Sequence, residues 1–93
     1  KGVEVLHNKN ESSYWIYTIK VNNQKRFMDV MKKKGIMVSR IHERNDKHSC
    51  VKKYKRKLPN LDKLVNQMIC IPVGWWLSKE DREYITNTIK EGW

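Results

Sequence analysis

The sequence predicts a small two-layer α/β domain of the α+β kind, in which three helices pack on a mixed or antiparallel sheet of about four strands. Segments rich in β-branched and aromatic residues alternate along the chain with amphipathic segments of helical period. With 93 residues, the chain can form one modest hydrophobic core but not two. The predicted order is β-β-α-β-α-β-α, and residues 1–93 are expected to form a single domain.

The first two predicted strands cover residues 3–7 and 14–21, and the polar turn 8–13 would join them as a hairpin. The second of these segments reads Tyr-Trp-Ile-Tyr-Thr-Ile-Lys-Val, a composition typical of strands.

A helix is predicted over residues 24–34, because Phe27, Val30 and Met31 recur at helical spacing among charged residues. Gly35 suits the left-handed position that ends many helices. The apolar run 36–42 predicts a third strand, so that strand, helix and strand would form a crossover unit.

Residues 43–57 are polar and show no clear period, as expected of a long loop. Asn60 is a candidate N-cap for a short helix over residues 61–68, and residues 69–73 predict the fourth strand. The segment 74–77 reads as a turn. Ser78 and Asp81 then approximate a capping box for a final helix that runs to about residue 90.

The net charge of +10, from 20 Lys and Arg against 10 Asp and Glu, raises the possibility of a nucleic-acid partner. The densest basic stretch is Lys52–Lys57, which includes Tyr54. A solvated basic face is the competing interpretation, and no helix-turn-helix, zinc-finger or RNP-like motif is present. A small basic nucleic-acid-binding module therefore stays open as the alternative function.

The histidines and cysteines do not predict a metal site or a catalytic centre. His42, His48 and Cys50 lie close together in sequence, but their spacing matches no standard zinc pattern. A cysteine and a histidine two residues apart rarely reach the geometry of a nucleophile and its base. The other cysteine, Cys70, forms no CxxC pair, and no apolar run approaches the ~20 residues that cross a bilayer. We expect a reducing, cytoplasmic setting and no membrane contact.

The segment His42-Glu43-Arg44-Asn45-Asp46 is the best candidate binding site, because it places an imidazole, a guanidinium, an amide and a carboxylate within five positions. Arg44 could bind a phosphate with two parallel hydrogen bonds, and Asn45 and Asp46 could bind hydroxyl groups. The alternative is structural: Asn45 and Asp46 would form a turn, and Arg44 would form a surface ion pair.

Taken together, five segments in this order resemble the C-terminal small domain of the DegT/DnrJ/StrS family, the PLP-dependent nucleotide-sugar aminotransferases. The resemblance covers about residues 14–93 and is carried by the aromatic strand 14–21, Met31-Lys-Lys-Lys-Gly35-Ile36, Val38-Ser-Arg-Ile-His42, Leu58-Pro-Asn60 and Ile71-Pro-Val-Gly-Trp-Trp-Leu-Ser78.

The resemblance implies that this chain is part of a larger homodimeric enzyme. Such an enzyme transfers an amino group from an amino acid, with glutamate the expected donor, to a keto sugar linked to a nucleotide. A lysine of the large domain, which this chain lacks, would hold the PLP, so the chain alone is expected to bind no cofactor and to be inactive. His42 would face the active site, although Glu43 replaces the aromatic residue that follows this histidine in many members. The expected substrate-binding residues are His42, Arg44, Asn45 and Asp46.

Overall fold

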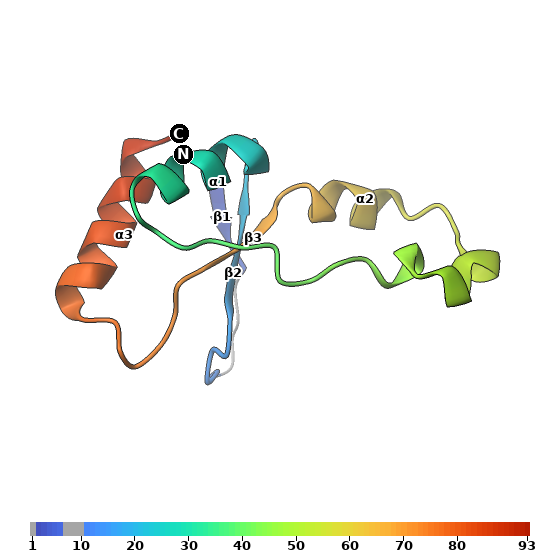
Figure 1. Ribbon diagram of the computed structural model, residues 1–93, viewed down its shortest axis with the longest axis horizontal. Coiled ribbons are helices and arrows are strands. Elements are labelled where there is room, and N and C mark those ends of the chain that lie inside the picture. Colours follow the sequence, from blue (N-terminus) through green and yellow to red (C-terminus); the bar gives the residue numbers. More distant parts are fainter. Residues whose placement is uncertain (1, 7–10) are drawn as a thin grey trace.

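The structure, a computed structural model, describes residues 2–6 and 11–93 and consists of a packed body with an arm projecting from it (Figure 1). In the described part of the chain, the body contains a sheet of three strands: β1 (Val3–Val5), β2 (Tyr17–Val21) and β3 (Met68–Ile71). The strand order is β1-β2-β3, and both pairings are antiparallel. The predicted hairpin is therefore confirmed for its strands, whereas His7 and residues 8–10 of its turn lie outside the described residues.

The prediction of a third strand over residues 36–42 is wrong, so the described sheet has three strands instead of four. Only Ser39 pairs there, in an isolated antiparallel bridge to Cys70 at the free edge of β3. Its two main-chain hydrogen bonds, Ser39 N to Cys70 O and Cys70 N to Ser39 O, measure 3.1 and 2.9 Å. The composition of the segment resembles a strand, but Met37 and Ile41 are exposed and the chain leaves the sheet after this one bridge.

Helices α1 (Gln24–Lys33) and α3 (Lys79–Glu91) form the second layer and pack with the sheet around one core. The sheet contributes alternate residues of β2 and β3, as the two-residue period of a strand requires. The buried apolar residues of the core are Ile19, Val21, Phe27, Met31, Ile36, Ile69 and Ile85.

Two of the three predicted helix-terminal motifs, at Gly35 and at Ser78, are confirmed. Gly35 has a φ of 74°, and the main-chain N–H of Ile36 donates to the carbonyl of Met31 at 2.9 Å, so the chain folds back after α1. At the start of α3, the Ser78 hydroxyl accepts from the Asp81 N–H and the Asp81 carboxylate accepts from the Ser78 N–H, each at 3.0 Å. This reciprocal pair is a capping box.

Other element boundaries differ from the prediction for local reasons. Strand β2 begins at Tyr17 rather than residue 14, because Tyr14 has a φ of 40° and cannot continue an extended strand. Strand β3 ends before Pro72, which has no N–H to donate to a neighbouring strand. Helix α2 (Pro59–Val65) begins one residue before the predicted N-cap Asn60, with Pro59 in its first turn, where the fixed φ of proline suits a helix.

The arm comprises residues 43–66 and contains two 3₁₀ helices, η1 (Asn45–Lys47) and η2 (Ser49–Tyr54), followed by α2. The radius of gyration is 15.2 Å, against about 12 Å for a compact chain of this length. The difference reflects the projection of the arm from the body, which gives the molecule extents of 48 × 30 × 22 Å. Within the described ranges, no helix is both long enough and apolar enough to cross a bilayer.

Candidate functional site

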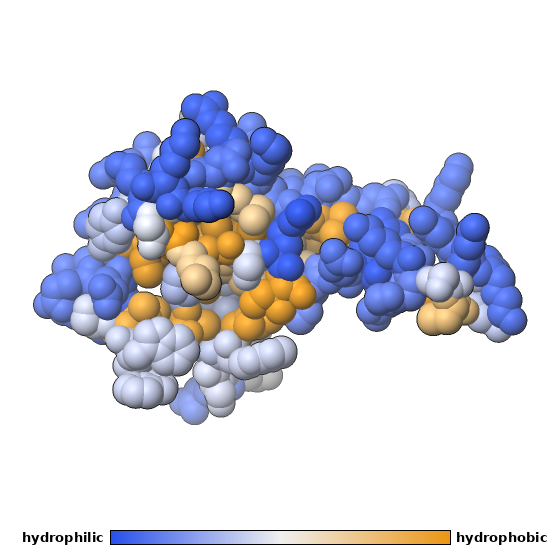
Figure 2. Space-filling view, in the orientation of Figure 1, coloured by the Kyte–Doolittle hydropathy of each residue, from blue (hydrophilic) through white to orange (hydrophobic). Residues whose placement is uncertain are grey.

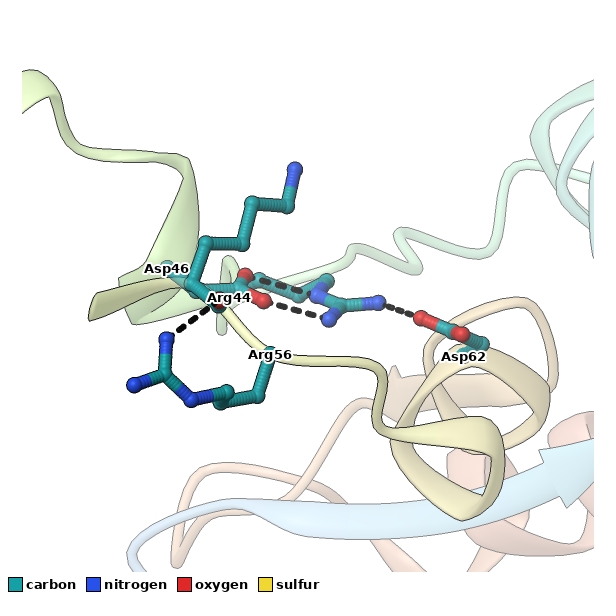
Figure 3. A network of polar contacts seen from close by, with 5 residues as sticks. Arg44, Asp46, Arg56 and Asp62 are labelled. Atoms are coloured by element: carbon teal, nitrogen blue, oxygen red, sulfur yellow. Dashed lines mark hydrogen bonds and ion pairs between the residues drawn. The ribbon is translucent and has the colours of Figure 1, made fainter. Parts of the chain in front are cut away.

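Arg44 forms the centre of an ion-pair cluster that joins the two sides of the arm (Figure 3). Its Nε donates to Oδ1 of Asp46 at 2.8 Å, and one of its terminal nitrogens donates to Oδ2 of the same carboxylate. The other terminal nitrogen donates to Asp62, which lies on α2. The guanidinium therefore forms a bidentate ion pair with Asp46 and also links the η1 turn to α2.

The local sequence explains why Arg44 and Asp46 meet. Arg44 has an extended backbone immediately before η1, and Asp46 lies in the first turn of that 3₁₀ helix. The N–H groups of Lys47 and His48 donate to the carbonyls of Arg44 and Asn45, which closes the turn. The structural alternative considered for this segment, a turn with Arg44 in an ion pair, is therefore present in the fold.

The electrostatics of the cluster favour the charged forms of both partners. The hydrogen bonds from Arg44 hold the pKa of Asp46 below its usual range, and the positive charges of Arg44 and Lys55 act in the same direction. Partial burial opposes this shift in the pKa of Asp46 but is the weaker influence. For Arg44, the hydrogen bonds to Asp46 and then Asp62 raise the pKa further above its already high value. Protonation of Asp46 would weaken the cluster, because a neutral carboxyl group loses its ionic attraction to Arg44.

The structure brings all four predicted site residues, His42, Arg44, Asn45 and Asp46, to a single cavity of about 320 Å³ at the base of the arm. The remaining lining is mainly apolar and comes from the approach to α2, from α2 itself and from the start of β3. These lining residues are Glu43, Leu58, Leu61, Val65 and Met68.

The four predicted residues do not offer the same chemistry to a ligand. His42 and Asn45 are exposed, and each has a polar group that can reach a ligand. Arg44 has engaged three of its five N–H groups with carboxylates, and its charge is opposed by two carboxylates. The cluster therefore favours a hydroxyl or amide partner over a phosphate near Arg44.

Sequence reasoning did not identify Asp62 or the apolar lining as parts of the site. The available signal was the spacing of Leu61 and Val65, which places both side chains in one apolar stripe along α2. The amphipathic pattern does not reveal that this stripe faces a cavity instead of the core, because that depends on where the arm lies.

The basic stretch Lys52–Lys57 lies on the arm and is exposed throughout. Lys53 Nζ lies 4.9 Å from the ring centroid of Tyr54, and Arg56 donates to the carbonyl of Lys55 at 3.1 Å. Cys50, on the same arm, is exposed, whereas Cys70 is buried beside Thr18. Among the residues that the structure describes, no group of three His, Cys, Asp or Glu side chains could hold a metal ion.

The residues around the cavity do not fit PLP. A PLP-linked lysine must supply an amine, and no lysine lines this cavity in the described structure. A cofactor phosphate would also meet the carboxylates that surround Arg44. The cavity instead offers a ligand a mainly apolar wall with two exposed polar side chains, those of His42 and Asn45.

The sequence profile of the DegT/DnrJ/EryC1/StrS aminotransferase family matches residues 1–90, and the chain belongs to this family. It corresponds to the small domain, which lies in the C-terminal portion of these proteins, as the sequence resemblance predicted. The family is PLP-dependent.

The chain is 40% identical to the sugar aminotransferase CalS13 from Micromonospora echinospora, with a TM-score of 0.93 over 99% of this chain. It is also 40% identical to AtS13 from Actinomadura melliaura, with a TM-score of 0.92 over 100% of this chain. At 22% identity, an aminotransferase of the same family from Brucella abortus shares the fold over 97% of the chain, with a TM-score of 0.84. The chain spans 26% of the length of each of these three proteins. No curated protein sequence matches it significantly.

Proposed function

We propose that this chain is the small domain of a PLP-dependent sugar aminotransferase whose large domain holds the cofactor. The whole enzyme, a cytoplasmic homodimer, transfers an amino group from glutamate to a keto sugar linked to a nucleotide. The support is the 40% identity to CalS13, a sugar aminotransferase, together with the meeting of His42, Arg44, Asn45 and Asp46 at one cavity. When PLP is bound in the large domain, it acts as the electron sink for amino transfer.

The role of this chain is to form one wall of the sugar-nucleotide pocket. Asn45 offers both a donor and an acceptor to a sugar hydroxyl, and His42 offers a second polar contact. Arg44 and Asp46 hold the wall in shape, and the N–H groups of Arg44 outside the ion pairs contact the substrate. The apolar side chains of Leu61 and Val65 exclude water from the same side of the pocket.

The test uses a joined protein, in which this chain replaces the matching quarter of CalS13. We expect Asn45→Ala to raise the KM for the nucleotide sugar about tenfold with little change in kcat, because a uniform binding contact is lost. We expect Arg44→Ala to raise the same KM, since it removes both a contact and the support of the wall. Asn87→Ala, an exposed position on α3, is the matched control and should leave both constants unchanged. Unchanged kinetics for Asn45→Ala and Arg44→Ala would overturn the assignment of the pocket wall.

A further inference from the structure

Gln24, the first residue of α1, carries a polar side chain into the interior, and only 8% of the residue is exposed. Its Nε2 donates to the main-chain carbonyl of Val65 at 3.3 Å and also to the carbonyl of Met68. Val65 ends α2 and Met68 begins β3, and we call residues 65–68 between these two elements the joint. One buried amide therefore connects the start of α1 to both ends of the joint.

The chemistry of the joint explains why an amide suits this position. The last carbonyls of a helix have no partner within that helix, so the carbonyl of Val65 needs a donor from elsewhere. The NH₂ group of Gln24 has two N–H groups and can donate to two carbonyls at once. A carbonyl that lost this donor would be left unsatisfied away from bulk water, and the main chain of the joint would have to move to find another partner.

Gln24 is itself fixed to the body. Asn23, the residue before it, caps α1, because its side-chain oxygen accepts from the N–H of Arg26 at 3.3 Å. Phe27, three residues after Gln24, is fully buried in the core, and its N–H donates to the carbonyl of Asn23 at 3.0 Å. The amide therefore ties the joint to a rigid part of the fold.

The direction of the arm is set where the arm joins the body. The incoming chain is held by the bridge from Ser39 to Cys70, and the returning chain is held at the joint by Gln24. Beyond these points the arm projects away from the body (Figure 1). On the face shown in Figure 2, the outer arm is mainly hydrophilic, so it offers little apolar surface for packing back on the body.

We propose that Gln24 is a positioning residue that fixes α2 relative to the body and thereby shapes the candidate cavity, an inference that rests on the proposed function. Val65 and Met68, whose carbonyls accept from Gln24, both line that cavity. Asp62, three residues before Val65 on α2, pairs with Arg44, so a shift of α2 would also move the opposite side of the cavity. Gln24 is not among the lining residues in the described structure and acts through them.

The distance between the arm and the body tests this positioning without any enzyme activity. Two spin labels report the distance in the 93-residue chain, one on Cys50, exposed on η2, and one on Asn87→Cys, an exposed position of α3. Cys70 is buried and should stay unlabelled. Gln24→Met keeps the length of the side chain but has no N–H, and it should broaden the distribution of distances about twofold. Equal distributions in Gln24→Met and the wild type overturn the proposal.

Thr88→Val is the matched control, because Thr88 is the other polar residue that is buried in the described part of the chain. Its hydroxyl donates to the carbonyl of Tyr84 at 2.7 Å, a hydrogen bond within α3. Thr88→Val should therefore leave the distribution of distances unchanged. An equal broadening in Thr88→Val overturns the positioning role of Gln24, since the loss of any buried hydrogen bond would then loosen the arm.

Gln24→Glu tests the two hydrogen bonds themselves and stays decisive if Gln24→Met does not fold. The carboxylate cannot donate, and burial beside two carbonyl oxygens raises its pKa. Once protonated, the carboxyl group donates one O–H to the joint. The distribution of distances should be broad at about pH 8 and narrow toward that of the wild type at about pH 5. The wild type, measured at both pH values, controls for the titration of histidine. The same distribution in Gln24→Glu at both pH values overturns the assignment of these hydrogen bonds.

The kinetics of the joined protein separate this inference from the proposed function. Gln24→Met should raise the KM for the nucleotide sugar about threefold with little change in kcat, because the cavity wall moves and no reacting group is lost, whereas Thr88→Val should leave KM unchanged. An active joined protein whose KM is the same in Gln24→Met overturns the link from Gln24 to the cavity. A wild-type joined protein without activity, together with a broadened distance in Gln24→Met, overturns the proposed function and supports the positioning of α2.

Discussion

The indole Nε1 of Trp93 donates a hydrogen bond of 2.7 Å to the main-chain carbonyl of Asn22, which joins β2 to α1. The same indole meets the buried ring of Phe27 edge to face, with the ring centroids 4.9 Å apart. The end of the chain is thereby fixed to the start of α1, and Trp93 closes one side of the core.

We expect Trp93→Ala to lower the free energy of unfolding of the 93-residue chain by about 2 kcal/mol, because a partly buried indole and its hydrogen bond are lost. Trp75→Ala is the matched control, since it removes the same side chain from an exposed position. It should change the free energy of unfolding by no more than about 0.5 kcal/mol. Urea unfolding followed by far-UV circular dichroism measures both variants, and equal effects would contradict the role of Trp93.

The Arg44 cluster should determine how firmly the η1 turn is held against α2. We expect Arg44→Ala to increase amide hydrogen exchange in residues 45–48, because the links to Asp46 and Asp62 are both lost. Arg44→Lys should recover the protection only in part, since an ammonium cannot grip a carboxylate at two points as a guanidinium does. Arg56→Ala is the control, because Arg56 donates only to the carbonyl of Lys55 in the described structure. If Arg44→Ala and the wild type show equal hydrogen exchange in residues 45–48, the cluster does not hold the η1 turn against α2.

The stability of the arm should depend on pH through Asp46. Its pKa is lower in the folded chain than in the unfolded chain, so its contribution is fully present above the unfolded value of about 4. That contribution is lost as the pH falls through the lowered pKa. Hydrogen exchange of the η1 amides, corrected for intrinsic rates, should therefore be independent of pH from about 7 to 5 and rise in stronger acid. In Asp46→Asn, the protection of the η1 amides should be weaker at neutral pH, and the rise in exchange in stronger acid should disappear. If the same rise persists in this variant, the titration of another group causes it.

Local signals were sufficient to predict the end of α1 and the start of α3. Gly35 needs a positive φ to end α1, and Ser78 and Asp81 satisfy each other's main-chain N–H groups at the start of α3, so each motif specifies its own boundary. The strand predicted over residues 36–42 failed because pairing depends on a distant partner. Strand β3 is short and ends before Pro72, and it offers that segment only the bridge from Cys70 to Ser39.

The candidate site was predictable only in part, because a local pattern identifies a segment but not the distant residues that it contacts. The clustering of His42, Arg44, Asn45 and Asp46 in sequence identified the segment, and the structure places these residues at one cavity. The partner of Arg44 on α2, Asp62, lies 18 residues from it, and no local pattern indicates that contact. The guanidinium of Arg44 is therefore largely paired with carboxylates instead of being available to a phosphate. Residue types and their spacing in the sequence do not reveal this pairing.

Amino transfer by the joined protein, compared with the 93-residue chain, tests the central claim most directly. With PLP, glutamate and a nucleotide-linked keto sugar supplied, we expect the joined protein to form the nucleotide-linked amino sugar, detected by mass spectrometry. CalS13 itself serves as the positive control. The 93-residue chain should form no product, because PLP does not fit its candidate site and the proposed function assigns the cofactor to the large domain. Product formation by the 93-residue chain alone, or none by a folded joined protein, would contradict the account.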